Sequence, residues 1–204
     1  MKLYTFSQAA NPRKVQIYLT EKGLTLDTVE VSLPGDLHLQ RDHLAKNPMA
    51  AVPILELDDD RTLTEADAII EYLEELHPEP ALVGENPWER ALTRELTTMA
   101  ERGLLDTALL VIEHSLEEYA DQINQVPAVA EHAKARFAHV VGLFDRLLAH
   151  HDYLAGSRFT VADITAFVGL HFGADAGCLV PGDARNVVQW FKKVAARPSV
   201  KNAT

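Results

Sequence analysis

The chain has 204 residues, of which 47% are apolar and 24% charged, and it carries a formal net charge of −11 at pH 7. A chain of this length can bury a substantial core, either as one domain or as two small ones. The negative charge argues against nucleic acid as a partner, because phosphate binding requires a basic face. No apolar run is long enough to cross a bilayer, and the sequence opens directly into a strand-like pattern. We therefore expect a cytoplasmic protein with no signal peptide and no membrane association.

The first part of the sequence predicts a small α/β domain over residues 1–77. Alternating apolar residues indicate strands, and apolar residues at helical spacing indicate helices. The predicted strands are 2–6, 26–31, 52–57 and 61–63, and the predicted helices are 12–22, 36–45 and 66–76. Gly23 follows the first helix, where glycine commonly stops a helix.

A linker is predicted at residues 78–86, because two prolines within His77–Pro80 break the preceding helix. Residues 87–204 then show only helical patterns, which predicts an all-helical second domain. The expected helices span 88 to about 119, 127–148, 161–173 and 184–196, with Arg197-Pro198 ending the last one.

One helix start is strongly specified in the second domain. Thr160 suits an N-cap and Asp163 stands three residues later, which predicts a capping box with Asp in place of Glu. Phe159 and Ile164 flank this turn at the spacing of a hydrophobic staple. We interpret this signal as structural.

Cys178 is the only cysteine. An intrachain disulfide is therefore excluded, which is typical of a reducing compartment. Because there is no Cys-x-x-Cys motif, any thiol chemistry must use a thiol brought by a ligand. We interpret Cys178 itself as a small buried hydrophobic residue, and we predict no metal site.

The segment from Ala51 to Leu57 begins with Val52-Pro53, an unusual start for an apolar strand. Proline cannot donate to a sheet ladder and is confined to strand starts, edges or bulges. We therefore expect the main chain of Val52 at an open edge, where an extended peptide can pair as an added strand. The helix that starts near Glu65 can hold a carboxylate at its N-terminus. Together these features predict a cradle for a small acidic peptide.

Four short motifs then occur in a characteristic order. They are Asn11-Pro12-Arg13-Lys14-Val15, Asn47-Pro48 ahead of Val52-Pro53, Glu65 at a helix start, and Phe159-Thr160-Val161-Ala162-Asp163. In this order and spacing, the chain resembles a cytosolic glutathione transferase over nearly its whole length. The resemblance implies a thioredoxin-like N-terminal domain, an all-helical C-terminal domain, a cis bond before Pro53 and a homodimer. It also implies glutathione as co-substrate, whose thiolate attacks a small electrophilic or disulfide substrate, as in detoxification.

The loop after the first strand departs from the pattern of this family. Many members carry a Ser that donates to the glutathione sulfur, and alignment through Arg13-Lys14-Val15 places Ala9 there. Asn11 matches an Asn that some bacterial classes place at the sulfur, and it also suits a helix cap followed by Pro12. Ser7 is a second candidate donor, with a plain loop hydroxyl as the alternative. The predicted catalytic residues are thus Asn11 and Ser7.

The remaining glutathione contacts also follow from the resemblance. Val52, before Pro53, matches the residue whose backbone pairs with the cysteinyl part of glutathione. Glu65 and Ala66 match the Glu-Ser pair that binds the γ-glutamyl end, although Ala66 keeps only the backbone N–H. His38 lies at the spacing of a His that binds the glycyl carboxylate.

Other positions remain open at the sequence level. Arg41, His43 and Lys46 lie near His38. For each of these four residues, a place on a solvated polar face is as good an explanation as binding of the glycyl carboxylate. By position alone, the second substrate would meet residues of the helical half, although such residues are more often core. These are Met99, Arg102, Phe167, His171 and Phe172. The resemblance places the dimer surface at residues 88–103.

Two alternative functions also remain. A glutathione-dependent disulfide or peroxide reductase would suit the combination of Ala9 and Asn11. A non-catalytic binding module would suit the losses at Ala9 and Ala66, since fold alone does not fix function. A thioredoxin-type redox protein is excluded because the sequence has no Cys-x-x-Cys.

Overall fold

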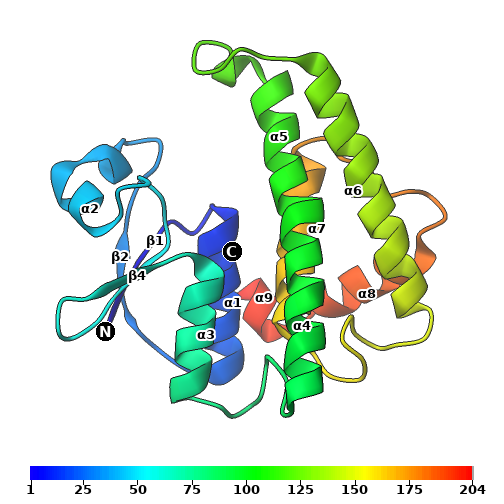
Figure 1. The fold of residues 1–204 in the computed structure, drawn as a ribbon, viewed down its shortest axis with the longest axis horizontal. Helices are drawn as coiled ribbons and strands as arrows, with labels where there is room; N and C mark the ends of the chain where they lie inside the picture. The colour runs from blue at the N-terminus through cyan, green and yellow to red at the C-terminus, as the bar shows by residue number, and fades with distance from the viewer. Residues whose placement is uncertain (204) are drawn as a thin grey trace. The chain divides into compact units, whose positions relative to one another are not determined.

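The computed structural model describes residues 1–203, which form two compact units. The first unit contains Met1–Leu82 together with the residues from Arg197 onward, and the second contains Val83–Ala196. Figure 1 shows all the strands in the first unit and only helices in the second. The predicted fold class, a thioredoxin-like domain followed by an all-helical one, is confirmed.

A four-stranded mixed sheet forms the centre of the first unit. Its strands are β1 (Lys2–Thr5), β2 (Asp27–Glu30), β3 (Ile54–Glu56) and β4 (Thr62–Thr64), in the order β2-β1-β3-β4. β1 pairs parallel with β2, whereas β3 pairs antiparallel with both β1 and β4. The helices of this unit are α1 (Ala10–Lys22), η1 (Leu37–Leu39), α2 (Arg41–Lys46), α3 (Ala66–Leu76) and α9 (Pro198–Lys201). In Figure 1, α1 and α3 lie side by side, and α2 lies away from them at the upper left.

The core of the first unit follows the apolar periodicity of the sequence. Leu3 and Leu55 pair across β1 and β3 and are fully buried, as is Val15 of α1. Helix α1 ends where predicted, at Gly23, which has φ 66° and donates to the carbonyls of Leu19 and Thr20. A residue without a side chain adopts this left-handed conformation readily.

The expectation that Val52 lies on an open sheet edge is wrong. β3 is an interior strand between β1 and β4, and its ladder begins at Ile54. Because Pro53 precedes the first paired residue, its missing N–H does not interrupt the ladder. Val52 therefore lies beyond the end of an interior strand.

The second unit is a helical bundle. It contains α4 (Pro87–Ala100), η2 (Glu101–Leu105), α5 (Asp106–Ser115), η3 (Glu117–Tyr119), α6 (Pro127–Leu148), α7 (Val161–Asp175) and α8 (Arg185–Ala195). α5 packs on α6, and α4 packs on α7. The long predicted helix from residue 88 contains a π-helical turn at η2. Gly103 lies in this turn, and an added Cβ would come within 2.5 Å of a Val140 methyl group, so the turn fits closely against α6.

The predicted capping box at the start of α7 is confirmed. Asp163 Oδ2 accepts from the Thr160 N–H at 3.0 Å and from the Thr160 hydroxyl at 3.1 Å. Asp163 Oδ1 accepts from the Leu154 N–H at 3.0 Å and from Trp190 Nε1 at 2.9 Å. One buried carboxylate thus joins the loop before α7, the start of α7 and helix α8.

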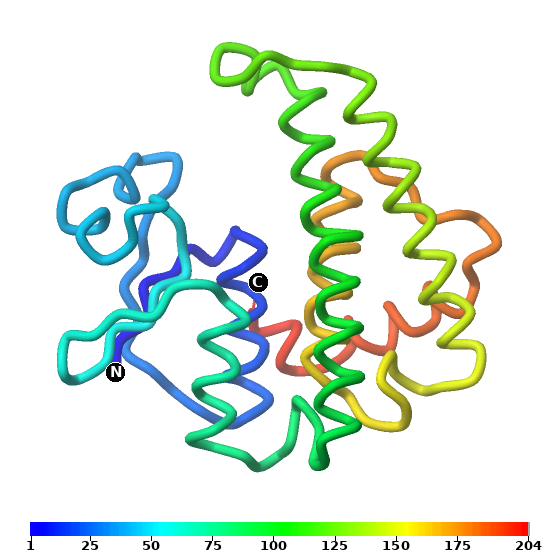
Figure 2. The backbone as a smooth tube through the Cα atoms, in the orientation of Figure 1, coloured from blue at the N-terminus to red at the C-terminus, as the bar shows by residue number. Residues whose placement is uncertain are grey.

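The end of the chain differs from the expected 87–204 domain, because residues 197–203 pack with the first unit. Pro198 does not simply end the preceding helix but opens α9. Glu21 of α1 accepts hydrogen bonds from Arg197 Nε at 2.8 Å and Nη2 at 2.7 Å, and another from the Ser199 hydroxyl. Figure 2 shows this last red segment beside the dark blue α1.

Replacing Glu21 with Gln is expected to destabilise the first unit at neutral pH by about 1.5–3 kcal/mol, the usual range for hydrogen bonds to a charged group. Burial acts to raise the pKa of Glu21, but the hydrogen bonds from Arg197 and Ser199 outweigh it and hold that pKa below its ordinary range. A depressed folded pKa gives stability that is present above the unfolded value of about 4.3 and is lost as the pH falls through the folded value.

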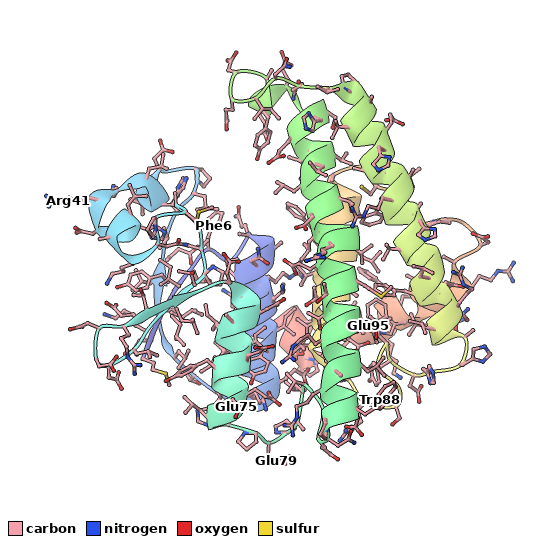
Figure 3. The ribbon with its side chains drawn as sticks, viewed as in Figure 1. Phe6, Arg41, Glu75, Glu79, Trp88 and Glu95 are labelled. Atoms are coloured by element: carbon pink, nitrogen blue, oxygen red, sulfur yellow. The ribbon has the colours of Figure 1, made fainter. Side chains whose placement is uncertain are left out.

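Urea unfolding of wild type and Glu21→Gln, at pH 7 and at about pH 3, measures this difference. The gap between the two proteins should shrink at the acidic pH. Glu75→Gln is the matched control, because Glu75 is an exposed acid on α3 of the same unit (Figure 3). An equal gap at both pH values would contradict the role of the charge.

No helix among residues 1–203 is both long and apolar enough to span a membrane.

Candidate functional site

Two buried side chains build the turn that precedes β3. Asn47 Nδ2 donates to the Ala51 carbonyl at 2.9 Å, and Asn47 Oδ1 accepts from the Met49 N–H at 3.0 Å. His43 Nε2 lies 3.1 Å from the same Ala51 carbonyl. These contacts fix the main chain immediately before Val52.

Val52 combines a buried side chain with an available main chain. The Val52–Pro53 bond is cis, as the family resemblance implied. The main-chain hydrogen bonds of residues 1–203 include none to the N–H or C=O of Val52. An extended peptide can use both groups as an added strand, at the end of β3 and not at a sheet edge.

Asn11 lies within the first turn of α1, so the expectation that it caps this helix is wrong. The cap is Ala9, whose carbonyl already accepts from the Arg13 N–H at 3.1 Å, and the helix begins at Ala10. Asn11 Oδ1 is buried and has no hydrogen-bond partner within the described part of the chain. Buried polar atoms are normally paired, so an orphan of this kind calls for a ligand or water.

Ser7 is less well placed than Asn11. It is exposed, and its backbone N–H donates to Glu30 Oε1 at 3.3 Å. Ala9 brings no hydroxyl to the start of α1. Of the two predicted sulfur donors, Asn11 therefore has the stronger structural support.

Glu65 has a backbone conformation that the sequence does not reveal. It is the N-cap residue of α3, with φ 68° and ψ 123°. A positive φ is uncommon for a residue with a side chain and costs of order 1–3 kcal/mol, and such residues cluster at ligand sites. The Glu65 side chain is exposed and makes no hydrogen bond or ion pair to residues 1–203. It is followed by Ala66, whose backbone N–H is one of the unpaired amides at a helix start.

The four basic residues of the segment around α2 differ in their contacts. Lys46 forms an ion pair with Glu56, and its hydrogen bond is the main cause of the lowered pKa of Glu56. His43 holds the Ala51 carbonyl, as described above. Arg41 is exposed and points away at the left edge of Figure 3. His38 Nδ1, in contrast, is buried without a hydrogen-bond partner in residues 1–203.

Among the candidates for the second substrate, Phe167 fits the core alternative. Its side chain is 2% exposed, and its ring stacks on Phe191 with centroids 4.7 Å apart. His171, one turn later, is exposed, with Nδ1 3.6 Å from Asp175.

In residues 1–203, no group of three or more His, Cys, Asp or Glu side chains is arranged to hold a metal ion.

Two family models match the chain. The N-terminal domain of glutathione S-transferase matches residues 3–81, and the C-terminal domain of glutathione S-transferase matches residues 100–198. The chain belongs to the glutathione S-transferase family. The prediction that it is a glutathione transferase enzyme is thereby confirmed at the level of the family.

Similar proteins agree with this assignment. Glutathione S-transferase 2 of Saccharomyces cerevisiae is 32% identical over 98% of this chain and 88% of its own length. The crystal structure of Gtt2 from Saccharomyces cerevisiae superposes with a TM-score of 0.92 at 31% identity, covering all of both chains. A glutathione S-transferase domain-containing protein from Marinobacter aquaeolei also has a TM-score of 0.92, at 37% identity over 98% of this chain and 100% of its own.

Proposed function

We propose that this transferase binds reduced glutathione in the first unit and uses the glutathione thiolate to attack a small electrophilic substrate. The observation that carries the proposal is the buried, unpartnered amide oxygen of Asn11 in the first turn of α1. A main-chain N–H of a bound peptide would satisfy this acceptor, and the Asn11 N–H₂ group can then donate to the ligand sulfur.

The peptide part of glutathione is assigned to four positions and the adjacent proline. The N–H and C=O of Val52, before Pro53, pair with the cysteinyl main chain. The Glu65 carboxylate and the Ala66 N–H bind the γ-glutamyl end, where Ala66 lacks the hydroxyl of the usual Ser. His38 binds the glycyl carboxylate through the Nδ1 that the fold leaves unpaired.

The chemistry depends on the protonation state of the ligand thiol. A free thiol titrates near ~8.5 and is mostly protonated at neutral pH, yet the thiolate is the nucleophile. The side-chain N–H₂ of Asn11 and the positive N-terminus of α1 both favour the charged form. The sulfur forms a bond to the electrophilic carbon, and the leaving group departs with the electron pair of the bond that breaks.

Replacing Asn11 with Ala is expected to raise the pKa of the bound thiol by about one unit, because one donor to the thiolate is lost. At a pH below both pKa values the reactive fraction, and with it kcat/KM, then falls about tenfold. The pH dependence of kcat/KM with an activated aryl chloride measures the shift. Glu75→Gln, at an exposed position of α3 outside the proposed site, is the control and should leave the profile unchanged. An unchanged profile in Asn11→Ala would remove Asn11 from the role.

A glutathione-dependent disulfide or peroxide reductase is the second candidate, favoured by the missing hydroxyl at Ala9 beside Asn11. Calorimetric titration with reduced glutathione and with its disulfide separates the two functions. Tighter binding of the reduced form supports the transferase, and comparable or tighter binding of the disulfide supports the reductase. Binding of neither form would indicate a non-catalytic module.

We further propose that the enzyme acts in detoxification as a cytoplasmic homodimer. In support of a partner surface, Trp88 of α4 is 73% exposed and lies within the segment that the resemblance assigns to the dimer (Figure 3). Light scattering of the purified protein gives the oligomeric state.

A further inference from the structure

A buried lysine joins the two helices that carry the proposed glutathione contacts. Lys14 belongs to α1, and its side chain is 1% exposed. Its Nζ lies 2.7 Å from Oδ1 of Asp67, near the start of α3, and the Asp67 side chain is 46% exposed. Helices α1 and α3 lie side by side, so the long lysine stem bridges them (Figure 1).

Each member of this pair lies within one helical turn of a proposed ligand contact. Lys14 follows Asn11 by three residues, and residues at this spacing share one face of a helix. Asp67 follows Glu65 by two residues and Ala66 by one. The ion pair therefore connects the turn proposed to hold the sulfur to the turn proposed to hold the γ-glutamyl end.

Stability alone does not explain a lysine at this position. Apolar residues of similar volume often replace buried ion pairs with no loss of stability, because desolvation of the charges offsets their attraction. Asp67 does not cap α3 either, because the N-cap residue of this helix is Glu65. The Asp67 carboxylate instead forms the ion pair with Lys14.

We propose that the Lys14–Asp67 ion pair is a positioning device that fixes the first turns of α1 and α3 relative to each other. One glutathione molecule can then be held at its thiol and at its γ-glutamyl end simultaneously. Geometry of this kind must be kept within a fraction of an ångström for both contacts to form together. The inference rests on the proposed glutathione site.

The first test variant is Lys14→Met, which keeps an unbranched stem but removes the charge. Urea unfolding of the variant establishes that any loss of binding occurs in folded protein. The affinity of the variant for reduced glutathione should fall about tenfold, which corresponds to about 1.4 kcal/mol. The pKa of the bound thiol, followed by thiolate absorbance, should move toward that of free glutathione.

Two further proteins make the result specific. Asp67→Asn should lose affinity only about threefold, because its amide oxygen can still accept a hydrogen bond from Lys14 Nζ. Asp59→Asn removes an exposed ion pair with Arg61 in the same unit, and it should bind as wild type does. Cysteinylglycine lacks the γ-glutamyl end, so it should compete equally well for wild type and Lys14→Met.

The outcomes are distinguishable. If wild type binds glutathione and both Lys14→Met and Asp67→Asn keep its affinity and thiol pKa, the positioning role is overturned, even if stability changes. An equal loss of affinity for cysteinylglycine would also overturn it, because the pair would then support the site only in general. If wild type itself binds no glutathione, the proposed function fails and this role fails with it.

Discussion

Replacing Glu65 with Gly is expected to stabilise the protein and, at the same time, to remove most of its affinity for glutathione. Glu65 has φ 68°, a conformation that costs about 1–3 kcal/mol for a residue with a side chain but is readily adopted by Gly. The larger unfolded-state entropy of Gly offsets about 0.5–1 kcal/mol of that gain. The exposed side chain gives up no contact with the fold, so the net change in unfolding free energy should be positive.

The loss of affinity comes from the carboxylate. A hydrogen bond to a charged group contributes about 1.5–3 kcal/mol, so binding of reduced glutathione should weaken about 10- to 150-fold. Urea unfolding and calorimetric titration of one preparation measure the two effects together. A strained residue that is retained although it lowers stability is what a ligand-binding role predicts.

Two matched variants separate the backbone from the charge. Glu65→Gln keeps the strained backbone and the side-chain shape, so it should lose affinity without gaining stability. Asp60→Gly relieves a similar conformation, φ 64°, in the turn between β3 and β4, and should gain stability without losing affinity. If Glu65→Gly destabilises the protein and leaves binding intact, Glu65 is a structural residue and not a ligand residue.

Local patterns in the sequence were sufficient to predict the elements of the fold. Helix α3 shows apolar spacing at Ile69, Ile70 and Leu73, and all three side chains are buried. Helix α1 ends at Gly23 as predicted, because glycine is the residue type that most readily adopts the left-handed conformation found there. Strand order is not encoded locally, which is why β3 was expected at an edge and lies in the interior.

The sequence did not reveal features that depend on partners far away in the chain. It also did not reveal backbone features at residue types that do not usually mark them. Ala9 has no side chain that marks a cap, so the start of α1 was placed too late. Glu is not a residue type that marks a positive φ, so the sequence did not predict the strained backbone of Glu65. The return of the C-terminus to α1 depends on Glu21 and Arg197, which are 176 residues apart. The basic segment was ambiguous because only the folded structure shows that the Ala51 carbonyl engages His43.

The largest loss of stability is expected from Asp163→Ala. Asp163 is fully buried, and its two oxygens accept hydrogen bonds from two backbone N–H groups, one hydroxyl and one indole. Burial raises the pKa of Asp163 above its ordinary range even though these donors favour the carboxylate. Its removal leaves the N–H groups of Leu154, Thr160 and Trp190 without acceptors inside the unit. Each unsatisfied buried donor costs about 1–3 kcal/mol, and neighbouring losses do not add fully.

We therefore expect Asp163→Ala to lower the unfolding free energy by about 4–5 kcal/mol, much of the total stability of a typical domain. Asp163→Asn should cost about half as much, because one acceptor oxygen remains while the amide group faces donors. Urea unfolding followed by tryptophan fluorescence is a suitable measurement, since Trp190 is 4% exposed and bonds directly to Asp163. Asp152→Asn is the control, because it disrupts an exposed ion pair with Lys193. Such pairs contribute about 0–1 kcal/mol. If Asp163→Ala costs no more than this control, the four hydrogen bonds do not hold α7 and α8 together.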